Sequence, residues 1–104
     1  MDEEQKAIPI AGLGHSTRGS CVHGDDVHGT IIEACEKWLI DGIPVALKWH
    51  KVRSDCGCIG EIVTGSNVSF VWCPVKRPVA RQGDEFSGDY TGVIVQGFPT
   101  RTTV

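Results

Sequence analysis

The sequence of 104 residues has little of what would place a protein in a membrane or on nucleic acid. No run approaches the roughly 20 apolar residues of a membrane helix. The acidic start, residues 1–6, lacks the apolar segment of a signal peptide. The net charge of −3 argues against a strongly basic face for nucleic acid. We therefore expect a soluble protein made in a reducing cytoplasm, a single domain over 1–104 with a loose start at 1–7.

Complete disulfide pairing is also excluded, because the chain has five cysteines. In a reducing compartment, neighbouring cysteine and histidine side chains more often bind metal or stay as buried thiols. No pair of Cys-x₂-Cys knuckles is present, so the chain is not a zinc ribbon. Cys35 and Cys73 stand in strand and turn contexts, and we expect both to be small buried apolar side chains rather than ligands.

What the sequence does have is internal repetition. A first phrase reads IPIA at 8–11, IPVA at 43–46 and RPVA at 77–80, so its prolines recur every 34 to 35 residues. A second phrase follows each copy and reads GTIIEA at 29–34, GEIVTG at 60–65 and GVIVQG at 92–97. Two phrases recurring in the same order at one period indicate a repeat architecture.

Helix-favouring residues are scarce, whereas glycine, valine, isoleucine and threonine are common, so the repeat predicts an all-β fold. Each unit reads as a Pro-x-Ala strand, a polar loop and a second apolar strand, with approximate bounds 8–42, 43–76 and 77–104. Asp41-Gly42 and the segment 73–76 predict hairpin turns. A helix over 31–40 is the alternative that the repeat disfavours.

Three such units predict a pseudo-threefold arrangement around a common axis, because one unit cannot bury its apolar face alone. The polar loops 16–28, 51–59 and 85–91 would then gather at one end. The hairpin turns and the C-terminus would gather at the other. Large apolar side chains are candidates for the core or for a contact surface: Trp38, Leu39, Phe70, Trp72 and Phe98.

The loop end carries the residues with metal chemistry. The first loop and its flanks hold His15, Cys21, His23 and His28; the second holds His50, Cys56 and Cys58; the third has neither residue type. Imidazole and thiolate together favour tetrahedral zinc. Four protein ligands would make such a site structural, with no open position for water. The competing interpretation is that the histidines lie on the loop surface and the thiols are free.

Several phrases match a known family: PVARQGD at 78–84, GIPVA at 42–46 followed by His50 and by DCGC at 55–58, and VTGS at 63–66. Through them, over about residues 8–99, the chain resembles the proline-alanine-alanine-arginine (PAAR) repeat family. These proteins form the pointed tips of phage tails and type VI secretion systems. The resemblance implies a cone of β-hairpins with one structural zinc near its vertex, typically bound by three histidines and one cysteine.

The resemblance also suggests ligands. His28 stands where the family has a His-Gly before the second strand, His50 matches the histidine of the closing segment, and Cys58, or else Cys56, matches the ligand cysteine. The third loop lacks the family's histidine, so another residue must complete the site. His23 is the first choice and His15 the second. The expected set is therefore His23, His28, His50 and Cys58.

The function that this resemblance implies is not enzymatic. The chain, itself a monomer, would cap and sharpen a trimeric β-helical spike, one chain per trimer, and touch the target membrane transiently without binding nucleic acid. The alternative is a stand-alone zinc-stabilised module that binds protein or nucleic acid. An enzyme using a Cys–His pair such as His50 with Cys56 is disfavoured, since no third orienting group or oxyanion phrase is evident.

Overall fold

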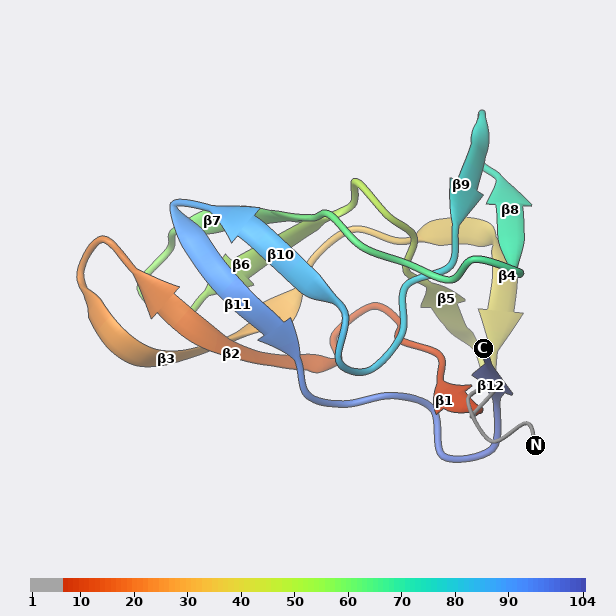
Figure 1. Ribbon diagram of the computed structural model, residues 1–104, viewed down its shortest axis with the longest axis horizontal. Coiled ribbons are helices and arrows are strands. Elements are labelled where there is room, and N and C mark those ends of the chain that lie inside the picture. Colours follow the sequence, from red (N-terminus) through yellow and green to blue (C-terminus); the bar gives the residue numbers. More distant parts are fainter. Residues whose placement is uncertain (1–6) are drawn as a thin grey trace.

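A computed structural model describes residues 7–104 as an all-β protein (Figure 1). Six antiparallel strands close into a barrel in the order β10–β11–β2–β3–β6–β7. Their bounds are β2 Ser16–Cys21, β3 Gly24–Ile31, β6 Lys51–Ser54, β7 Ile59–Ile62, β10 Glu85–Gly88 and β11 Tyr90–Ile94. The part of the chain that the structure describes contains no long apolar helix of the kind that spans a membrane.

Three small two-stranded sheets, two of them hairpins, form the other end of the molecule, which we call the base. They pair β1 with β12, β4 with β5 and β8 with β9. Their bounds are β1 Ile8–Pro9, β12 Thr102–Thr103, β4 Cys35–Ile40, β5 Ile43–Val45, β8 Phe70–Trp72 and β9 Lys76–Pro78. Figure 1 shows the base on one side and the β2–β3 turn at the far, narrower end. We call that narrow end, with the β2–β3, β6–β7 and β10–β11 turns, the vertex.

A closed ring of three backbone hydrogen bonds lies between the barrel and the base. The amide of Ala11 donates to the carbonyl of Ala80 (2.9 Å), that of Ala80 to Ala46 (3.0 Å) and that of Ala46 to Ala11 (3.0 Å). All three alanines are fully buried. They come from the three copies of the Pro-x-Ala phrase, so the repeat in the sequence corresponds to a threefold arrangement of the backbone.

The prolines of the same phrase are related in the same way. The carbonyls of Pro44, Pro78 and Pro9 accept hydrogen bonds of 2.8–2.9 Å from amides of the preceding or following repeat. The donors are Leu13, Lys48 and Gln82. Proline has no amide hydrogen to donate, but its carbonyl is free to accept, so the residue is accommodated without an unpaired group.

The core has two parts. One fills the barrel and includes Ile31, Val52, Ile62, Phe86 and Tyr90. The other lies under the base hairpins and contains Ile10, Cys35, Ile40, Val45, Leu47, Val79 and Phe98. Among the large apolar side chains named from the sequence, Phe98 is buried and Trp38 packs against this second part, whereas Leu39, Phe70 and Trp72 are exposed.

The segments expected to be polar loops are mostly barrel strands. Thr17, Val52 and Phe86 point inward and are buried, between neighbours that face solvent. The interior is so narrow that a Cβ atom on Gly92 would lie 2.1 Å from the carbonyl oxygen of Arg18. Polar and glycine-rich segments therefore form strands here, because bulkier residues would keep the chains apart.

The expected hairpins are present. Ile40 pairs with Ile43 across Asp41 and Gly42, whose positive φ angles of 53° and 82° are those of a tight hairpin turn. Trp72 pairs with Lys76 in the β8–β9 hairpin. Residues 35–40 form β4, so the strand interpretation of 31–40 is confirmed over the helical one.

The sequence interpretation did not predict one feature of the cysteines. Cys35 and Cys73 are not separate thiols but form a disulfide between the β4–β5 and β8–β9 hairpins. Both lie in or against the apolar cluster of the base, as expected for small buried side chains. The two hairpins are neighbours there, which brings residues 38 positions apart into contact.

Candidate metal centre

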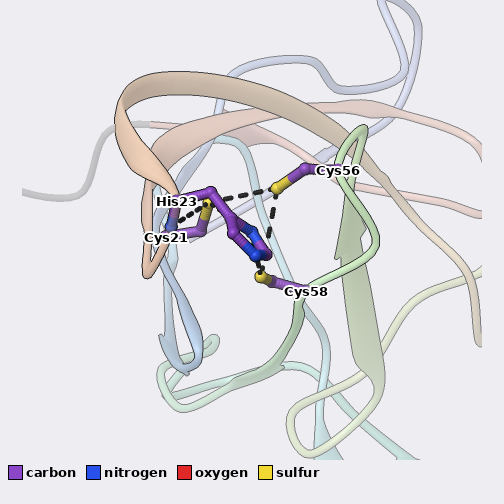
Figure 2. Close-up of side chains that lie close together, drawn as sticks. All are labelled: Cys21, His23, Cys56 and Cys58. Atoms are coloured by element: carbon purple, nitrogen blue, oxygen red, sulfur yellow. Dashed lines mark hydrogen bonds between the residues drawn. The ribbon is translucent and has the colours of Figure 1, made fainter.

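Two of the three vertex turns carry a pair of metal-binding side chains separated by one residue. The β2–β3 turn presents Cys21 and His23, and the β6–β7 turn presents Cys56 and Cys58 (Figure 2). The four ligand atoms all lie within 4.8 Å of one another. Cys56 is exposed, Cys21 is half-buried and Cys58 is buried.

The β6–β7 turn is held by the side chain of Ser54. Its buried hydroxyl accepts a hydrogen bond from the amide of Cys58 (2.9 Å) and contacts the sulfur of Cys56 (3.0 Å). Between the two cysteines, Gly57 has a φ angle of 97°, a conformation that side chains disfavour. The amide of Asp55 donates to the carbonyl of His28, which ties this turn to β3.

Of four separations between ligand atoms, three are close to those around a single tetrahedral ion, and the fourth, between Cys21 and Cys56, is shorter. The Sγ atoms of Cys56 and Cys58 are 3.9 Å apart, and those of Cys21 and Cys56 are 3.1 Å apart. Nδ1 of His23 lies 3.4 Å from the sulfur of Cys58 and 3.9 Å from that of Cys21. Tetrahedral zinc with bonds of about 2.0–2.3 Å places its ligand atoms about 3.5–3.8 Å apart. The donor set of three sulfurs and one nitrogen also fits a soft divalent metal.

The thiols differ in acidity because their surroundings differ. The hydrogen bond from Ser54, followed by those from Cys21 and His23, lowers the pKa of Cys56 to about 6. Burial, followed by the hydrogen bonds with Cys56 and Cys21, raises the pKa of Cys58. Three adjacent thiolates repel one another, so a bound cation would favour the charged form of all three.

The third vertex turn contributes no ligand. Instead Tyr90 lies fully buried within the barrel, where its hydroxyl bonds to that of Thr17 (2.9 Å) and its ring packs on Phe86. Burial is the largest cause of the raised pKa of Tyr90, and the hydrogen bond with Thr17 opposes it. The phenol therefore stays neutral and fills the barrel.

The structure brings together only some of the residues expected as ligands. His23, Cys58 and the alternate Cys56 belong to the cluster. His28 lies on β3 with its imidazole exposed, and its Nε2 atom is 4.0 Å from a carboxylate oxygen of Asp26. His50 directly precedes β6, whereas Cys56 lies beyond its other end. The length of that strand, about 13 Å, therefore separates the two residues. A Cys56–His50 pair is therefore not formed.

His15 and His50 have another role, which they share with Asp84. Nδ1 of His15 accepts the amide of Gly12 (3.0 Å), Nδ1 of His50 accepts that of Leu47 (2.9 Å), and Oδ2 of Asp84 accepts that of Arg81 (2.6 Å). Each acceptor is buried and lies three residues after its donor. These side chains stabilise the same turn in the three repeats.

Cys21 is the member of the cluster that the sequence interpretation placed in the first loop but left out of the expected ligand set. The repeat itself contains the signal that identifies it. Cys21 and Cys56 are 35 residues apart, as are His23 and Cys58. This is the spacing between the prolines of the first two repeats, so the two turns supply their ligands from equivalent positions.

A comparison with protein-family models gives one match. The model for the PAAR motif matches residues 23–89, more than half of the chain. The matched segment includes His23 and both cysteines of the β6–β7 turn. A search of curated proteins finds no match.

Proposed function

The chain belongs to the PAAR-motif family, and from that membership we propose that it is a non-enzymatic spike tip of a contractile injection machine, either a phage tail or a type VI secretion system. One chain caps the blunt end of a trimeric β-helical spike and gives it a sharp end. The vertex touches the target envelope first.

The internal threefold arrangement is the feature that supports this proposal best. The ring of hydrogen bonds through Ala11, Ala46 and Ala80 gives the single chain a threefold axis. Three two-stranded sheets surround that axis at the base. A single chain can match a trimer in this way, because each small sheet offers a similar edge to one of three identical chains.

Exposed apolar side chains on the base would supply the contact. Leu39 on β4 and Phe70 and Trp72 on β8 are all exposed, and Trp72 retains 65% of its accessible surface. Phe70 and Trp72 face the same side of their strand, away from Val71, which packs against the core. Large aromatic side chains left in solvent are typical of surfaces that bind another protein.

At the vertex, we propose that Cys21, His23, Cys56 and Cys58 hold one zinc ion. The ion would join the β2–β3 and β6–β7 turns and so stiffen the end that meets the envelope. The family typically uses three histidines and one cysteine, whereas this site would use three cysteines and one histidine. Zinc accepts both sets.

The metal proposal is tested by metal analysis of purified variants. Wild type and His28→Ala should each contain one zinc per chain, whereas Cys58→Ser and His23→Ala should contain much less. His28→Ala is the matched control because His28 lies outside the cluster. Equal zinc in all four proteins, or dependence on His28, would assign the metal to other residues.

The capping proposal is tested by the mass, in solution, of the chain mixed with the C-terminal β-helix of the spike protein encoded nearest to its gene. We expect one chain per spike trimer. Trp72→Glu should weaken the complex, whereas Val22→Glu should not, since Val22 is also exposed (73%) but lies at the vertex. No complex, from a folded chain that carries zinc, would favour a stand-alone zinc-stabilised module.

A further inference from the structure

Two thiols of the vertex lie closer together than a shared metal requires. The sulfurs of Cys21 and Cys56 are 3.1 Å apart, whereas those of Cys56 and Cys58 are 3.9 Å apart. Cys21 and Cys56 belong to different turns, so a bond between them would cross-link the β2–β3 and β6–β7 hairpins. These are the turns that the proposed zinc would join.

We propose that Cys21 and Cys56 are a redox-active pair that a small disulfide, such as oxidised glutathione, converts into a second cross-link at the vertex. For the reduced form this inference rests on the proposed zinc site. In the reduced protein the metal holds the two turns together, and in the oxidised protein a covalent bond holds the same turns. The vertex would thus stay closed in both environments.

The exposure of the thiols determines which pair reacts. Cys56 is exposed and can meet an oxidant, Cys21 is half-buried beside it, and Cys58 is buried. The amide of Cys58 is held by Ser54. A disulfide has a bond of about 2.05 Å, so the sulfurs of Cys21 and Cys56 need to approach by about 1 Å, roughly half of what Cys56 and Cys58 need.

The neighbouring groups favour attack by these sulfurs. The hydroxyl of Ser54 lies 3.0 Å from the sulfur of Cys56. The amide of His23 donates to the sulfur of Cys21 (3.3 Å). These contacts hold both sulfurs in place beside each other, where the second can displace the leaving group from the first.

The reaction balances in two exchange steps. The thiolate of Cys56 attacks one sulfur of glutathione disulfide, the S–S bond breaks and one glutathione leaves as thiolate. The thiolate of Cys21 then attacks the Cys56 sulfur of the mixed disulfide, and the second glutathione leaves. The two protein thiols lose two electrons to the glutathione, and a zinc ion held at this site would lose two of its four ligands and be released.

The cysteine count is consistent with this state. Cys35 and Cys73 already form a disulfide at the base. A second bond between Cys21 and Cys56 would leave one thiol of the five, the buried Cys58. The metal site has three thiols, and only two of them can join in a disulfide. This accounts for the odd number of cysteines in the chain.

In the test, the full chain is treated with oxidised glutathione, once with zinc bound and once after chelation with EDTA. Release of zinc is followed with a chelating dye. Free thiols should fall by two per chain, and dithiothreitol with added zinc should restore the metal. The two thiols should also return, counted in the Cys35→Ala/Cys73→Ala variant, which has no base disulfide for dithiothreitol to reduce. The new disulfide is mapped by cleavage of the chain after glutamate. Cys21, Cys35 and Cys73 then lie on three different fragments, and Cys56 and Cys58 lie together on a fourth. The fragment with Cys21 should be joined to the fragment with Cys56.

Three variants make the outcome specific. Cys58→Ser should lose zinc but still form the cross-link, and it removes any ambiguity about which cysteine of the turn reacts. Cys56→Ser and Cys21→Ser should not form it. A cross-link that uses Cys58, or stable glutathione adducts without a cross-link, would overturn the inference. If the wild-type chain binds no zinc and yet forms the cross-link, the metal proposal fails and the disulfide assignment stands.

Discussion

At the scale of single residues, three equivalent positions use two kinds of side chain for one task. His15, His50 and Asp84 each accept a backbone amide three residues earlier. An imidazole can do so only while Nδ1 carries no proton, whereas a carboxylate accepts without that restriction. The first two repeats should therefore lose this hydrogen bond when their histidines are protonated.

This difference predicts how stability depends on pH. Burial, and then the charge of Arg77, lowers the pKa of His50 from 6.5 to about 4, against a smaller opposing effect of Glu33. Between these two pH values the unfolded chain binds a proton at His50 and the folded chain does not. The free energy of unfolding should therefore fall as the pH decreases from 6.5 to 4, by about 2–3 kcal/mol from this residue.

The measurement is urea unfolding of wild type and His50→Asn across that pH range. Asparagine keeps an acceptor oxygen, as Asp84 does in the third repeat, but cannot titrate. The variant should show a smaller loss of stability on acidification. Burial lowers the pKa of His15 too, so some loss should remain. Equal losses in the two proteins would contradict the assignment of the pH dependence to His50.

The alanines of the central ring give a prediction about packing. Ala46 is fully buried where three chain segments meet, so Ala46→Val should force the ring apart and lower the free energy of unfolding by about 1–3 kcal/mol. Ala7→Val makes the same change at an exposed site and should alter stability by no more than about 0.5 kcal/mol. Chemical denaturation of both variants measures the difference, and equal stabilities would mean that the ring tolerates larger side chains.

At the scale of elements, the sequence predicts the base better than the barrel. The β4–β5 hairpin has Asp41-Gly42 between apolar strands, which is a strong local signal. The barrel strands β2, β6 and β10 each carry at most one large apolar residue among polar residues and glycine, so their alternation is weak. Their pairing depends on contacts between repeats, which no short segment of the sequence encodes.

The disulfide is the covalent connection between two base hairpins. A cross-link between residues 38 positions apart removes conformational freedom from the unfolded chain, which is worth about 2–4 kcal/mol. Adding dithiothreitol to zinc-loaded protein should therefore lower the urea midpoint of wild type. The double variant Cys35→Ala/Cys73→Ala should start lower and show no further change with the reductant. A similar decrease in both proteins would place the effect at the vertex thiols instead.

At the scale of the whole molecule, the repeat predicted the threefold architecture but not which side chains converge. His28 and Cys21 lie in the same loop of the sequence, yet the direction of each side chain depends on its place in a barrel strand or turn. Imidazole also serves as a ligand or as a backbone acceptor, and residue type does not distinguish these uses. The equivalent positions of Cys21 and Cys56 were the information in the sequence that specified the cluster.

The separation of the vertex from the core predicts what metal removal does. The base cluster and the alanine ring include no residue of the two ligand-bearing turns, and the barrel cluster includes Cys58 and contacts Cys21 but consists mostly of other residues. The chain without metal should therefore stay folded, unlike a small zinc finger, whose folding depends on its metal.

Hydrogen exchange measures this local effect. Exchange should become about tenfold faster or more at amides of residues 21–24 and 55–58, because the free energy of local opening there falls by about 1.4 kcal/mol. The amides of Ala11, Ala46 and Ala80 should exchange as before. Fast exchange at these alanines after chelation would show that the metal holds the whole fold and not the vertex alone.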